Sequence, residues 1–170
     1  MENSLPKCKP NRLKGFDYST NGMYFVTICT KGKEKILWNN ERYDNSVGAD
    51  SIRPQDAVPL SEYGKIADTA VKNIGRYYSS IKVENYIVMP NHIHILIFID
   101  RYDNGRIISA PTLSVVIGQM KRWVSRQIGK PIFQKSFHDH IIRSDEDYKK
   151  IYNYIESNPS EWEDDCFYVE

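Results

Sequence analysis

The sequence lacks a long hydrophobic run and a strong net charge. Its 170 residues carry a formal net charge of +1. The most apolar stretch, residues 93–99, is interrupted by His94 and is far shorter than the ~20 residues that a membrane-spanning helix needs. The basic N-terminus is not followed by the apolar segment of a signal peptide. We therefore expect a cytoplasmic protein without a membrane segment.

Cysteine is also scarce. The 3 cysteines, Cys8, Cys29 and Cys166, lie far apart and form no CxxC pair. This number and spacing exclude a disulfide scaffold and a zinc knuckle, and are typical of reduced thiols. A chain of 19.9 kDa with 41% hydrophobic residues can bury a core of its own. We expect one domain over residues 1–170, with an N-terminal arm at 1–20 and loops at 39–59 and 100–111.

Hydrophobic periodicity and capping residues predict an α+β fold. Ser61, Thr112 and Ser144 are suitable N-caps, and Gly129 and Pro159 are suitable helix stops. The predicted strands cover 24–30, 84–89, 92–99 and 136–143, and the predicted helices cover 62–78, 113–128 and 145–158. This order predicts a ferredoxin-like antiparallel sheet with the helices packed on one face.

The low net charge hides an uneven distribution. Residues 7–35 contain seven Lys or Arg against two carboxylates, a local charge of +5, and residues 112–143 contain six against one, again +5. Residues 144–170 contain two Lys against nine carboxylates, a local charge of −7. Trp123 lies between Arg122 and Arg126, and this mixture of rings and cations suits unpaired bases. The alternative is an ordinary solvated surface.

His92 and His94 are two residues apart in a predicted strand, so both imidazoles project from the same face. The isoleucines at 93, 95, 97 and 99 take the other face and supply the core contact. Paired neutral imidazoles are common ligands of a divalent metal, with a third ligand from elsewhere in the fold. A short His-x-His pair also arises by chance, and the spacing alone leaves both interpretations open.

The last predicted helix carries a second pattern. Tyr148, Ile151, Tyr152 and Ile155 recur at helical spacing and form the expected buried stripe. Tyr154 falls outside this stripe, and Asn158 lies one turn further on the same side. The spacing permits a functional pair, or simply a solvent-edge tyrosine and a C-capping asparagine.

Taken together, these segments resemble one known family. Met89-Pro90-Asn91-His92-Ile93-His94 resembles the HUH motif of single-tyrosine transposases, and the rest of the chain is similar to the REP-associated branch of that superfamily. The similarity includes the strand from Gly22, the Met120-Lys121-Arg122 helix, the segments 133–134 and 139–143, and 154–159 with Trp162. Two positions depart from the family pattern. Phe133 replaces a usual tryptophan and His140 a common arginine, which affects the expected DNA sequence preference more than the chemistry.

The resemblance implies a reaction and its residues. His92, His94 and Asn158 would bind Mg²⁺ or Mn²⁺, and Tyr154 would attack the scissile phosphate to form a 5′-phosphotyrosine. The substrate would be single-stranded or hairpin DNA, and the protein a monomer or a homodimer. The DNA-binding residues would be Lys121, Arg122 and Arg126, with Arg143, Arg12 and Lys14. Three alternatives stay open: a DNA-binding module that does not cleave, a relaxase-like nickase, and a metal-dependent hydrolase that uses the histidines without a tyrosine nucleophile.

Overall fold

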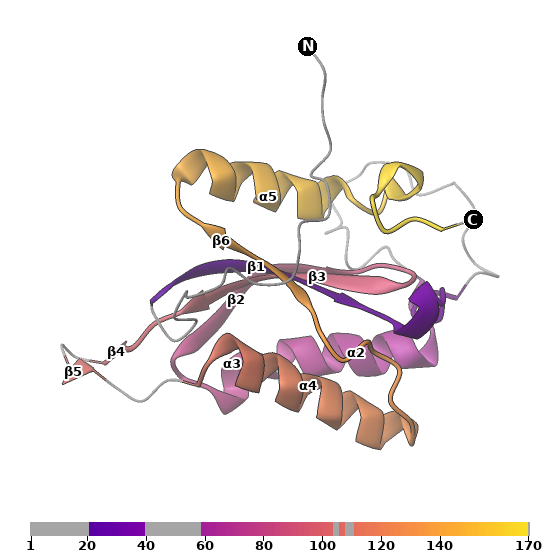
Figure 1. Cartoon of the computed structure of the whole chain (residues 1–170), viewed down its shortest axis with the longest axis horizontal. Coiled ribbons are helices and arrows are strands. Elements are labelled where there is room, and N and C mark those ends of the chain that lie inside the picture. The colour runs from indigo at the N-terminus through magenta and orange to yellow at the C-terminus, as the bar shows by residue number, and fades with distance from the viewer. Residues whose placement is uncertain (1–20, 40–58, 104–105, 108–110, 170) are drawn as a thin grey trace, which may run out of the picture.

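A four-stranded antiparallel sheet forms the centre of the protein, with strand order β2-β3-β1-β6 (Figure 1). The structure is a computed structural model that describes residues 21–39, 59–103, 106–107 and 111–169. The strands of the sheet are β1 (Gly22–Cys29), β2 (Ile81–Val88), β3 (His92–Ile99) and β6 (His138–Ile142). β1 pairs with both β3 and β6, and β2 pairs with β3 in a tight hairpin. The α+β prediction and the antiparallel sheet are confirmed.

Capping residues define the helices much as the sequence predicts. The helices are α2 (Glu62–Lys72), α3 (Ile74–Tyr77), α4 (Leu113–Ile128) and α5 (Asp145–Ser157). The side chains of Ser61, Thr112 and Ser144 each accept a hydrogen bond from the backbone N–H three residues later. Gly129 ends α4 in the left-handed conformation, with φ 83°. The helix predicted over 62–78 is interrupted at Asn73, which caps α2.

The helices lie on both faces of the sheet, which differs from the expectation that they all pack on one face. α2, α3 and α4 cover one face, and α5 lies across the other (Figure 1). β3 is the physical reason, because Ile93, Ile95 and Ile97 face the first layer while Leu96 faces α5. Ile151 and Ile155 of α5 join Leu96 in a second buried cluster. Since both faces of the sheet carry apolar side chains, both must be covered.

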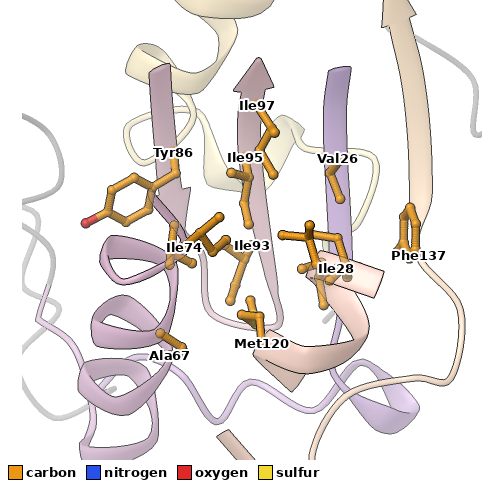
Figure 2. Packing of buried hydrophobic residues seen from close by; sticks show 14 of the residues in the cluster. Val26, Ile28, Ala67, Ile74, Tyr86, Ile93, Ile95, Ile97, Met120 and Phe137 are labelled. Atoms are coloured by element: carbon orange, nitrogen blue, oxygen red, sulfur yellow. The ribbon is translucent and has the colours of Figure 1, made fainter. Parts of the chain in front are cut away.

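The larger core lies between the sheet and the first helix layer. Figure 2 shows Val26 and Ile28 of β1 beside the isoleucines of β3, with Ala67 of α2 and Met120 of α4 packed against them. Each fully buried isoleucine contributes about 1.5–3 kcal/mol of transfer free energy. This packing fixes the position of β3, and therefore of the side chains on its opposite face.

Short elements connect this frame. A 3₁₀ turn, η1 (Lys31–Lys33), follows β1, and a second one, η3 (Trp162–Asp164), follows α5. The predicted loop at 100–111 contains a small ladder of β4 (Tyr102–Asp103) and β5 (Arg106–Ile107). The predicted arm at 1–20 and most of the predicted loop at 39–59 lie outside the described residues. Within the described part of the chain, no helix is both long enough and apolar enough to cross a membrane.

Candidate active site

Two histidines at the start of β3 form the base of the candidate site. As the alternation of the strand predicts, the rings of His92 and His94 share one face, and their Nε2 atoms lie 2.9 Å apart. Both side chains are fully buried. Their backbone positions are set by pairing with β1, where His94 lies opposite Thr27 and His92 opposite Cys29. The imidazoles are therefore held together by the sheet itself.

The other nitrogen of each imidazole has a fixed partner. The Nδ1 atom of His92 lies 2.8 Å from the Oδ1 atom of Asn91, and the Nδ2 atom of Asn91 donates to the carbonyl of Phe167 at 2.9 Å. Since a carbonyl oxygen only accepts, this network assigns the proton of His92 to Nδ1 and leaves the Nε2 lone pair available. The Nδ1 atom of His94 bonds the hydroxyl of Thr27 at 2.8 Å. Such outer partners orient metal-binding imidazoles.

α5 brings a hydroxyl and an amide to the same place. The hydroxyl of Tyr154 lies 3.3 Å from Nε2 of His94 and donates to Oδ2 of Asp165 at 2.5 Å. The Nδ2 atom of Asn158 donates to the same carboxylate oxygen at 2.6 Å. The Oδ1 atom of Asn158 is buried and has no hydrogen-bond partner among the described residues. Tyr154, Asn158 and the two histidines therefore form one cluster.

The buried face of α5 differs from the expected stripe. Ile151 and Ile155 are buried, but Tyr152 is 36% exposed, and Tyr154 turns toward the sheet. The actual face runs through 151, 154, 155 and 158 and is shifted toward the polar pair. Hydropathy misplaces it because Asn158 is buried and Tyr154 is half-buried, and both side chains donate hydrogen bonds to Asp165. The interpretation of Tyr154 as a solvent-edge residue is therefore wrong.

Sequence reasoning missed Asp165. This fully buried carboxylate lies just after η3, with Oδ2 3.7 Å from Nε2 of His94 and 4.0 Å from Nε2 of His92. Its Oδ1 atom accepts a hydrogen bond from the backbone N–H of Phe167 at 2.6 Å. His92, His94 and Asp165 together could hold a metal ion. No local pattern distinguishes Asp165 from the other carboxylates of the acidic C-terminal segment, so the sequence contained no signal for it.

Burial controls the charges in this cluster. It lowers the pKa of His92 and His94, and the neighbouring imidazole and Lys33 of η1 lower that of His92 further. Burial, followed by the charge of Asp165, raises the pKa of Tyr154 above its usual value. Burial would raise the pKa of Asp165, but hydrogen bonds and the adjacent imidazoles outweigh it and lower that pKa. The cluster therefore contains neutral imidazoles, a neutral phenol and one carboxylate.

Aromatic rings close the cluster to solvent. The ring of Phe167 lies 4.9 Å from that of His92, and the ring of Trp162 lies 5.7 Å from it, measured between centroids. Phe25 stacks on His94 at 5.0 Å. A DNA phosphate can therefore contact these imidazoles only when some of these rings have moved.

The chain is similar to known proteins over most of its length. The structure aligns with a REP-associated tyrosine transposase bound to a REP hairpin, with a TM-score of 0.60 and 19% sequence identity over 89% of this chain and 74% of that one. The chain has the fold of a REP-associated tyrosine transposase. A protein of Haemophilus influenzae, described only as uncharacterised, is 27% identical over an alignment of 178 positions. The alignment covers 94% of this chain and 92% of the relative. No protein-family model matches the chain.

The predicted DNA-binding residues occupy several parts of this transposase fold. Arg122 and Arg126 are exposed on α4, in the helix layer opposite Tyr154. Lys121 on the same helix is half-buried, and its Nζ atom donates to the carbonyl oxygens of Gln134 and Ser136 at 3.0 and 2.6 Å. Burial lowers the pKa of Lys121 to about 8. The structure does not bring these three cations to the tyrosine side of the sheet.

The other predicted cations are scattered. Arg143 is exposed directly after β6, while Arg12 and Lys14 lie outside the described residues. Lys33 acts on the cluster electrostatically, and its Nζ atom lies 5.6 Å from the ring centroid of Phe167. Sequence reasoning included Lys33 in a basic segment but did not assign it to the site.

Proposed function

We propose that the protein cleaves and rejoins single-stranded or hairpin DNA with the help of a divalent metal, through a 5′-phosphotyrosine at Tyr154. The observation that carries this proposal is the convergence of the Tyr154 hydroxyl, two imidazole nitrogens and the Asn158 amide in one buried cluster. This cluster lies on the fold of a transposase whose solved structure contains a REP hairpin. A hairpin is therefore the form of DNA to test first.

The donor set fits a divalent cation. The Nε2 atoms of His92 and His94 face each other, and Oδ2 of Asp165 lies near both. Oδ1 of Asn158 is buried and has no partner in the part of the chain that the structure describes. An unsatisfied buried oxygen costs about 1–3 kcal/mol unless something coordinates it. Mixed nitrogen and oxygen donors suit Mn²⁺ better than Mg²⁺, which prefers oxygen ligands. When bound, the cation would neutralise charge on the scissile phosphate and polarise it.

In the proposed reaction, Oη of Tyr154 forms a bond to phosphorus while the bond from phosphorus to the 3′ oxygen breaks. The products are a 5′-phosphotyrosine and a strand that ends in a 3′-OH, so the proton that the phenol loses is balanced by the one that the 3′ oxygen gains. The phenol proton has an acceptor in place, because Tyr154 already donates to Oδ2 of Asp165. The 3′-OH can later attack the phosphotyrosine and restore the phosphodiester. Rejoining needs no ATP because the ester bond is conserved.

A labelled-DNA assay tests this function. Wild-type protein and Tyr154→Phe are incubated with Mn²⁺ and hairpin DNA from the flanks of the gene, labelled at either the 5′ or the 3′ end, and separated on a denaturing gel. We expect the 3′-labelled fragment to migrate with wild-type protein and the 5′-labelled fragment to be released free. Tyr154→Phe should give neither. Tyr152→Phe is the matched control, because it removes the same atom from an exposed tyrosine of α5.

The other outcomes separate the alternatives. Cleavage without a conjugate on either label would indicate a hydrolase, and DNA binding without cleavage would indicate a non-cleaving module. A conjugate that persists in Tyr154→Phe would contradict the assignment of the nucleophile.

A further inference from the structure

An open groove lies on the face of the molecule opposite the tyrosine cluster. It runs between α4 on one side and α3 with the end of α2 on the other, and its cavity volume is about 320 Å³. Its lining includes three aromatic residues, Tyr77, Tyr78 and Trp123, and two arginines, Arg122 and Arg126. None of the described residues that line it is acidic. The groove therefore combines flat aromatic surfaces with positive charge.

Helix geometry produces this combination. On α4, Gln119 precedes Arg122, Trp123 and Arg126 by three, four and seven residues, so all four share one side of the helix. The hydroxyl of Tyr78, just after α3, donates to the side-chain oxygen of Gln119 and connects the two walls. The groove therefore lies between packed helices and is not a gap between loops.

Two features of the groove are exposed to solvent and open to a ligand. Tyr77 is 70% exposed, the largest exposure among the large hydrophobic side chains of the described residues. Arg122 and Arg126 have no ion-pair partner among the described residues. An exposed ring beside unpaired guanidinium groups is the combination that binds single-stranded nucleic acid, since every base has a flat face and every nucleotide a phosphate.

We propose that this groove binds an unpaired nucleotide of single-stranded DNA, with the base stacked on the exposed ring of Tyr77, beside Trp123, and the phosphate on Arg122 and Arg126. The volume is at the lower end of the range of small-ligand sites, ~300–1,000 Å³, which suits a single nucleotide. An acidic peptide would satisfy the guanidinium groups but leave the rings without a stacking partner. The choice of DNA rests on the proposed function. The groove adds a DNA contact on the face of the sheet opposite the reacting tyrosine.

Tryptophan fluorescence tests the proposal directly. Trp38 and Trp162 are only 4% and 7% exposed, whereas Trp123 lines the groove. The measurement uses full-length Tyr154→Phe, which cannot form a conjugate, titrated with oligothymidine and with an abasic strand of the same length. We expect oligothymidine to quench the emission and Trp123→Phe to remove that quenching. Quenching that remains in Trp123→Phe originates from the other tryptophans, of which Trp162 lies beside His92.

Substitutions in the groove separate stacking from charge. Tyr77→Ala should weaken oligothymidine binding about tenfold but leave the weaker abasic binding unchanged, because only stacking is lost. Arg122→Gln with Arg126→Gln should reduce the slope of log affinity against log salt by about 0.7, since the two arginines share one phosphate and each phosphate contact on a single strand accounts for ~0.7. Tyr102→Ala is the matched control, because Tyr102 is 59% exposed and lies outside the groove.

Two results would overturn the proposal: equal affinity for oligothymidine and the abasic strand, or unchanged affinity in Tyr77→Ala. Neither result would change the outcome of the conjugate assay with wild-type protein, so the proposed function would stand. Conversely, binding in the groove without any conjugate would support the groove proposal and refute the strand-transfer reaction.

Discussion

Replacing Thr27 by valine should weaken divalent metal binding without disturbing the sheet. Valine has nearly the shape of threonine and favours strands, so the substitution removes one hydroxyl from β1 and little else. That hydroxyl is the partner of Nδ1 of His94 at 2.8 Å. A metal-bound His94 carries its proton on Nδ1, and without the hydroxyl that proton has no acceptor, so the ring proton is better placed on Nε2. An Nε2 atom that carries a proton cannot coordinate a metal.

The expected magnitude follows from the contacts that are lost. Removing an outer partner of a metal-binding imidazole costs 10- to 100-fold in affinity, or about 1.4–2.7 kcal/mol. The metal-free protein loses one buried hydrogen bond and should be destabilised by about 1–3 kcal/mol. A domain with ordinary stability of about 5–15 kcal/mol tolerates that loss and remains folded.

Calorimetric titration with Mn²⁺ measures the affinity, and urea denaturation measures the free energy of unfolding. Ile28→Val is the matched control, because Ile28 follows Thr27 on β1 but faces the opposite core. This control should lose about 0.5–1.5 kcal/mol of stability and no metal affinity. Equal Mn²⁺ affinity for wild-type and Thr27→Val would refute the reasoning that His94 is a ligand oriented by Thr27.

Three further predictions concern stability. Burial lowers the pKa of His94 below its ordinary 6.5, so below about pH 6.5 the unfolded chain binds more protons than the folded one. The free energy of unfolding, measured by urea denaturation, should therefore decrease as the pH falls through this range, and should decrease less in His94→Gln. Gly64→Ala should destabilise the protein by about 3 kcal/mol in the same assay, because a Cβ atom at this position would lie 2.0 Å from the carbonyl oxygen of Leu37. Lys121→Met should lower the thermal midpoint, since it removes two hydrogen bonds to carbonyls before β6, and should leave the salt dependence of DNA binding unchanged.

Capping residues and strand alternation in the sequence predicted those elements whose boundaries are set by residues close in the chain. β3 covers His92–Ile99 as expected, and α4 runs from the Thr112 cap to the left-handed Gly129. The start of β2 was predicted three residues late. Ile81 is the true first residue, and a register shift between Val83 and Asn85 breaks the alternation that a single strand would show.

The position of α5 could not be predicted from its own residues. Its side of the sheet depends on Leu96, an apolar residue on the histidine face of β3, and on packing that only the assembled fold creates. The pair His92 and His94 was predictable because a strand has period 2. Tyr154 and Asn158 were predictable as a pair because a helix brings residues four apart together, but their inward direction depends on Asp165.

The missed carboxylate changes the charge balance of the site. With neutral imidazoles and an ionised Asp165, the cluster has a net charge of −1, which repels a DNA phosphate and raises the pKa of Tyr154. A divalent cation held by the same donors would change the net charge to +1. At ~4 Å and an effective dielectric constant of 20, one pair of unit charges interacts by about 4 kcal/mol, so this reversal is large for both the phosphate and the phenolate. The proposed reaction is therefore disfavoured without metal and favoured with metal, and the unfavourable half of this dependence comes from the charge of Asp165.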